Sequence, residues 1–94
     1  MLNNTKDTIF IGKKPLMTYV TSAIIQLATM PSITIKARGL SITHAVDVVQ
    51  IVLHKTNPAF MIGDIRIGSE ALESQDGRTR NVSTIEISIK KVAA

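Results

Sequence analysis

Cysteine and tryptophan are absent from this sequence of 94 residues, and aromatic residues make up only 3% of it. Without cysteine the chain forms no disulfide and offers no thiolate ligand to a metal ion, which is compatible with a reducing cytoplasm. With so few rings, the core must be built from aliphatic side chains, and the abundant isoleucine and valine favour strands. We therefore expect a cytoplasmic protein that folds as one domain over residues 1–94.

Long hydrophobic runs are missing as well. No apolar stretch approaches the roughly 18 residues that are needed to cross a bilayer. The first ten residues, MLNNTKDTIF, lack the apolar segment of a signal peptide. We therefore expect no membrane partner.

Patterns of catalytic and metal-binding residues are equally scarce. His44 and His54 stand apart from any thiol or HExxH motif, and no G-x-S-x-G motif occurs. The GKKP stretch is not a Walker A motif, because Asp7 occupies the place of its first glycine and the lysines are followed by Pro15, without the serine or threonine that the motif needs. We expect no catalytic residue, no metal and no cofactor.

Positive charge is in modest excess, with a formal net charge of +4. Such a charge fits an anionic partner, and it fits equally a surface that is basic only for solubility. The charge alone leaves both interpretations open.

Hydrophobic spacing predicts alternating strands and helices. The expected order is βαβαββ, an α/β (α+β) two-layer sandwich in which two helices cover one face of a mixed four-stranded sheet. The expected elements are a strand from Thr8, a helix from Pro15 to Met30, a strand Ser32–Arg38, a helix from a Ser41 or Thr43 cap to about Lys55, and two long strands at about Phe60–Ser74 and Thr79–Lys91.

The second helix carries more apolar residues than one buried stripe requires. Val48 and Ile51 add to a stripe that includes Val52. Surplus apolar surface on a small domain favours a homodimer interface, for which Val48, Ile51 and Val52 are the candidates. The alternative is a wider stripe that is covered within one chain.

The final hairpin is expected to be irregular and to protrude. A two-residue turn at Asp76-Gly77 would place Ile67 opposite Glu86, which buries charge beside isoleucine. We therefore predict a bulge or an odd-length loop, for example a three-residue turn with Gly77 in the left-handed conformation. Strands of roughly 50 Å outreach helices of about 21 Å, so the polar tip extends past the core either as a binding arm or as a loop that only blunts the sheet edge.

Basic residues follow the first two strands. Lys13 and Lys14 come after the first strand, and Lys36 and Arg38 end the second. Because parallel strands end at the same edge of a sheet, these four residues should gather there beside two helix N-termini. Like charges that gather in this way favour a polyanion such as duplex DNA or RNA as the partner.

Four segments, IFIGKKPLMTYV, ITIKARGLSITHAVDVVQIV, DIRIGSE and SQDGRTRNVSTIEISIKK, resemble the Alba family of archaeal chromatin proteins over nearly the whole chain. The resemblance implies a fold like the C-terminal domain of translation initiation factor three. It implies a dimer that coats and compacts double-stranded DNA on the chromosome, contacting phosphates through basic loops and the minor groove through its hairpin arms. The alternative function on the same fold is RNA binding, as a ribonucleoprotein subunit or RNA chaperone. The low aromatic count disfavours base stacking in that case.

The resemblance also assigns roles to residues. It implies nucleic-acid contacts for six basic residues, and acetylation of Lys13, which would remove one charge. Leu40 and His44 replace basic residues common in the family, and Thr56 replaces an aromatic residue that packs dimers together, so a heterodimer with a related chain is an alternative to the homodimer. The implied contacts are Lys13, Lys14, Lys36, Arg38, Arg78 and Arg80.

Overall fold

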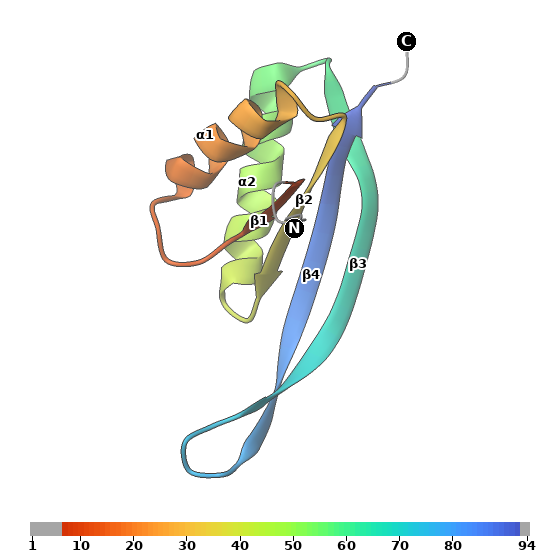
Figure 1. Ribbon diagram of the computed structural model, residues 1–94. Coiled ribbons are helices and arrows are strands. Elements are labelled where there is room, and N and C mark those ends of the chain that lie inside the picture. Colours follow the sequence, from red (N-terminus) through yellow and green to blue (C-terminus); the bar gives the residue numbers. More distant parts are fainter. Residues whose placement is uncertain (1–6, 93–94) are drawn as a thin grey trace, which may run out of the picture.

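The strands assemble into one mixed sheet in the computed structural model, which describes residues 7–92. The strand order is β1-β2-β4-β3, with β1 parallel to β2 and the other neighbours antiparallel. Both helices lie on the same face of this sheet (Figure 1), which confirms the predicted two-layer architecture. The elements are β1 (Thr8–Phe10), α1 (Leu16–Leu27), β2 (Ser32–Arg38), α2 (Ser41–Thr56), β3 (Phe60–Glu73) and β4 (Thr79–Lys91).

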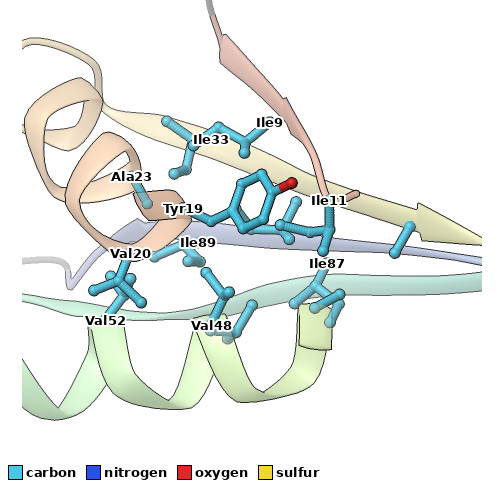
Figure 2. Close-up of a cluster of buried hydrophobic side chains, with 14 of the residues drawn as sticks. Ile9, Ile11, Tyr19, Val20, Ala23, Ile33, Val48, Val52, Ile87 and Ile89 are labelled. Atoms are coloured by element: carbon cyan, nitrogen blue, oxygen red, sulfur yellow. The ribbon is translucent and has the colours of Figure 1, made fainter. Parts of the chain in front are cut away.

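The core is a layer of aliphatic side chains between the sheet and the helices (Figure 2). Alternate residues of the strands point toward the helices, so that Ile9, Ile35 and Ile87 lie opposite one another across three strands. Ile35 and Ile89 are completely buried. Among the described residues no charged side chain is buried, and Tyr19 is the one buried residue with a polar side-chain group, so burial of apolar surface is the main stabilising term.

Helix α2 corrects the predicted dimer interface. Val48 and Val52 are 0% exposed within the single chain, and Ile51 is partly buried against the same core. The helix packs on β2 and β4 and also lies beside α1, so two of its sides are covered. The surplus apolar residues therefore form a wide stripe inside the chain, and Val48 and Val52 offer no surface to a partner.

The N-terminus of α2 lacks the predicted side-chain cap. Leu40 occupies the cap position of α2 with helical backbone angles, and neither Ser41 nor Thr43 caps the helix. Pro15 precedes α1, also without a side-chain cap. Both helices therefore begin with backbone N–H groups that no side chain satisfies.

The hairpin turn confirms the predicted irregularity. Glu73 pairs with Thr79, and the N–H of Ser74 donates to the carbonyl of Arg78 at 2.8 Å. Three residues remain in the turn, and the last of them, Gly77, has φ 82°, a left-handed value that favours glycine. This register places Ile67 opposite Ile85 and keeps the apolar residues on one face.

A bulge between Ile62 and Ile65 shifts the alternation of β3. The N–H of Asp64 donates to the Ser88 hydroxyl at 3.0 Å, and a Cβ on Gly63 would lie 2.4 Å from that hydroxyl oxygen. Only glycine permits so close an approach. As a consequence Ile62 and Ile65 share the helix-facing side, although residues three apart lie on opposite faces of a regular strand.

The distal hairpin extends beyond the rest of the fold (Figure 1). The last residue pair between β2 and β4 is Arg38 with Thr84, so beyond the pair of Gly68 with Thr84 the two strands of the hairpin pair only with each other. We call residues 68–83 the arm. The longest dimension of the molecule is 51 Å, against 30 and 22 Å for the others. The predicted reach past the core is confirmed.

Candidate nucleic-acid interface

The loop Gly12–Pro15, here called the lysine loop, carries Lys13 and Lys14 from β1 to α1. The N–H of Ile11 donates to the carbonyl of Lys36 at 2.8 Å, which holds the start of the loop beside the end of β2. Both lysines are exposed. Within residues 7–92 neither forms an ion pair, so their charges are available to an anion.

Tyr19 of α1 holds the lysine loop from inside. Its hydroxyl oxygen accepts hydrogen bonds from the N–H of Gly12 at 2.8 Å and of Lys14 at 3.0 Å. The ring is only 8% exposed and packs in the core, with the oxygen directed toward Ile11 (Figure 2). Two bonds to one buried anchor fix the backbone on both sides of Lys13. No sequence motif marks this tyrosine, and sequence analysis missed it.

Lys36 and Arg38 lie on the face of the sheet that the helices leave open, because the residue between them, Ala37, points into the core. Each has an acidic neighbour. The Lys36 ammonium is 3.6 Å from a Glu86 carboxylate oxygen, and the Arg38 guanidinium is 2.7 Å from that of Glu70. The positive charges of Lys36 and Arg38, two of the four basic residues expected at this edge, are thus partly neutralised by these carboxylates.

Three structural features share this end of the molecule. The parallel strands β1 and β2 both end here, α2 begins three residues after Arg38, and the arm continues outward from Thr84. The first turns of α1 and α2 contain no acidic residue. Their free N–H groups and dipoles therefore add positive potential beside the lysine loop.

The arm carries Arg78 and Arg80 in different settings. Arg78, at the turn, has its Nε 3.7 Å from an Asp76 carboxylate oxygen. Hydrogen bonds from the Ser74 hydroxyl and the Arg78 N–H lower the pKa of Asp76, so the acid stays charged. Arg80 pairs with Leu72 across the hairpin and makes no ion pair among the described residues.

Two residues of the open face were also missed. Phe10 is 60% exposed, and Arg66 lies opposite Glu86 in the sheet. The alternation of buried Ile9 and Ile11 was a signal for Phe10, because the residue between two inward-facing neighbours in a strand must face outward. The same signal was available for Arg66, which lies between Ile65 and Ile67 beyond the bulge in β3.

His44 and His54 are both exposed on α2. Residues 7–92 contain no group of three or more histidine, cysteine or acidic side chains that could hold a metal ion. No helix in that range is long and apolar enough to span a membrane.

Comparison with known proteins gives a consistent picture. The profile of the Alba family matches residues 7–69. A protein of Nitrosopumilus maritimus (strain SCM1) named "DNA/RNA-binding protein Alba" is 68% identical over 92 residues, which is 97% of either chain.

Solved structures show the same fold. Alba from Thermoplasma volcanium superimposes with a TM-score of 0.82 at 43% identity, covering 88% of this chain and 98% of its own. ALBA1 from Trypanosoma brucei gives a TM-score of 0.76 at 17% identity, covering 96% of this chain and 73% of its own. The latter similarity concerns the fold alone.

Proposed function

Because the chain belongs to the Alba family, we propose that it is a chromatin protein that binds and compacts double-stranded DNA with little sequence preference. The exposed, uncompensated lysine loop is the observation that carries this proposal. It lies at the edge from which the arm projects and where two helices begin. A phosphate backbone presents the row of anions that such a surface attracts. We assign the protein no catalytic activity.

The protein acts as a dimer in this proposal. Ile65 and Ile67 are 55% and 82% exposed on the helix-facing side of β3, the edge strand of the sheet. A long edge strand with exposed isoleucines is prone to pairing unless a partner covers it. A second copy that covers this surface would bring two lysine loops and two arms to one duplex. A related chain with the same surface would give a heterodimer.

The arms serve as the second contact. Arg78 and Arg80 lie along the minor groove, where arginine is attracted by the negative potential of a narrow groove. Arg80 is the stronger contact, because Arg78 is engaged by Asp76. Lys36 and Arg38 contribute less than the lysine loop for the same reason, since Glu86 and Glu70 compensate them.

Acetylation of Lys13 would regulate this binding. The lysine is exposed, so a modifying enzyme can reach it. The modification removes one of the two charges of the lysine loop and so weakens phosphate binding.

Salt-titrated binding to duplex DNA tests the proposal. For a dimer that neutralises about six phosphates, the logarithm of affinity falls with that of salt concentration with a slope near −5. The double variant K13A/K14A should weaken binding to all sequences alike and flatten the slope.

The matched control is K90A/K91A. It removes the same charge from two adjacent exposed lysines at the opposite end of the sheet, where Lys90 pairs with Ser32. We expect it to leave the slope nearly unchanged. Equal weakening by both double variants would show that net charge alone attracts DNA, and affinity independent of salt would overturn the proposal.

The mass in solution tests the dimer. Ile67→Asp should give a monomer with unchanged helix content, because Ile67 is outside the core. Ile25→Asp is the control, since Ile25 is 65% exposed on α1 and should leave the dimer intact. A wild-type monomer at micromolar concentration would refute the dimer without deciding whether the chain binds DNA.

RNA binding, as a ribonucleoprotein subunit or RNA chaperone, is the second candidate function. The name of the Nitrosopumilus relative includes both nucleic acids, and the exposed ring of Phe10 favours a contact with unpaired bases. Competition between duplex DNA and structured RNA separates the two functions. A clear preference for RNA at physiological salt would favour the second.

A further inference from the structure

A groove of about 430 Å³ crosses the open face of the sheet. All four strands line it, with Phe10 from β1, Lys36 and Arg38 from β2, Glu86 from β4 and Glu70 from β3. It lies on the side of the sheet away from the helices. The lysine loop does not line it, so the groove is a separate surface.

The charges of the groove balance one another. Lys36 is 3.6 Å from Glu86 and Arg38 is 2.7 Å from Glu70. A phosphate placed between these pairs would meet two carboxylates as well as two cations. The groove is therefore poorly suited to a phosphate backbone alone and better suited to a flat, polar-edged molecule that uses both donors and acceptors.

Phe10 supplies an aromatic surface at one end of the groove. Its side chain is 60% exposed although it is apolar, and the Lys36 ammonium lies 5.7 Å from the centre of the ring. An exposed ring on a sheet surface with cations beside it is the arrangement on which proteins stack unpaired nucleobases. The low aromatic content does not prevent stacking when the single ring is placed in such a groove.

We propose that this groove binds one unpaired nucleotide of a single strand. The base stacks on Phe10, and its N–H groups donate to Glu86 or Glu70. These N–H groups take the place of the cations beside the carboxylates. Lys36 and Arg38 are then free to contact the flanking phosphate. The proposal rests on the proposed nucleic-acid function and adds a contact to bases that the lysine loop cannot make. Through it, one chain could hold a duplex and an adjoining unpaired residue.

The variant Phe10→Leu removes the ring and keeps an apolar side chain at the same place. We expect it to weaken binding to a short single strand about tenfold, the loss typical of one stacked base. Binding to a duplex without unpaired residues should change less than about twofold, because the lysine loop is intact. Single strands of RNA and of DNA are tested in parallel, and a selective loss with either one supports the site.

The variant Phe10→Trp provides a direct signal. The chain contains no tryptophan, so the emission of this variant reports the groove alone. We expect a single strand to quench it in a saturable manner and the duplex to quench it much less, since the duplex contacts Lys36 beside the ring but does not stack on it. The control Ile25→Trp places an equally exposed ring on α1 and should respond to neither.

Several results would overturn the proposal. One is an unchanged single-strand affinity in Phe10→Leu, and another is an equal loss for duplex and single strand. A third is equal quenching of Phe10→Trp by duplex and single strand. The last is an emission change with protein concentration alone, which would mean that a second copy fills the groove. Failure of the wild type to bind duplex DNA at all would instead refute the proposed function. The two failures are therefore distinguishable.

Discussion

The lysine loop and the arm present basic side chains in opposite ways. The loop is held by the buried hydroxyl of Tyr19 and rests on the core. The arm is held only at its base, where Glu70 pairs with Arg38 and the Ser83 carbonyl accepts from the N–H of Gly39, and toward the turn its strands pair only with each other. Charges on a fixed loop set where a duplex lies, whereas charges on an unsupported hairpin can follow its groove. The difference suggests that this fold divides positioning and adaptation between two regions.

The largest expected difference is in the free energy of unfolding, between the core on which the lysine loop rests and the arm. Ile35→Ala removes a completely buried side chain and should lower the free energy of unfolding by about 2–5 kcal/mol. Leu72→Ala in the arm should lower it by less than about 1 kcal/mol, because the arm has no core. Urea unfolding measures both. Comparable losses would mean that the arm is part of the cooperative unit.

Tyr19→Phe should loosen the lysine loop and leave the core packed. The ring remains, but the N–H groups of Gly12 and Lys14 lose their shared acceptor. We expect a loss of about 1–2 kcal/mol in unfolding free energy and a duplex affinity several-fold lower. Faster amide exchange confined to Gly12 and Lys14 distinguishes loosening of the loop from general destabilisation. Unchanged exchange at both amides would contradict an anchoring role.

Within the arm, the two arginines should differ. Arg80→Ala is expected to weaken duplex binding about threefold, since Arg80 has no acidic partner among the described residues. Arg78→Ala should weaken it less, because the Asp76 carboxylate already lies close to Arg78. Both are measured at one salt concentration. The reverse order would show that DNA displaces Asp76 at little cost.

Acid should affect the turn of the arm, and weakly. The Ser74 hydroxyl and the Arg78 N–H lower the pKa of Asp76 from its ordinary 3.8. A lowered pKa stabilises the folded turn above the ordinary value, and this stabilisation is lost as the pH falls through the folded value. The amide signals of Gly77 and Arg78 should therefore titrate with a midpoint below 3.8. In Asp76→Asn that transition should disappear, while signals of the lysine loop should not shift in either protein.

Much of the fold could be predicted from local pattern. The alternation in β2 and β4 defines their faces, and the opposition of Ile67 and Ile85 required the odd-length turn that Gly77 makes possible. The position of Lys13 and Lys14 after a short strand was equally plain. The prediction of Val48 and Val52 as interface residues was wrong, because the apolar stripe of a helix does not reveal how many other elements of the chain will cover it.

Sequence by itself determined the order of strands and helices, the length of the hairpin and the residues that carry charge, because each depends on spacing along the chain. Only the tertiary structure decided which of those charges remain unpaired. Glu70 and Glu86 compensate Arg38 and Lys36 across strands, and Tyr19 reaches back to the lysine loop. These contacts depend on strand register and on the placement of α1. The physical reason is that an ion pair or a hydrogen bond forms between neighbours in space, and such neighbours are set by the packing of the whole chain.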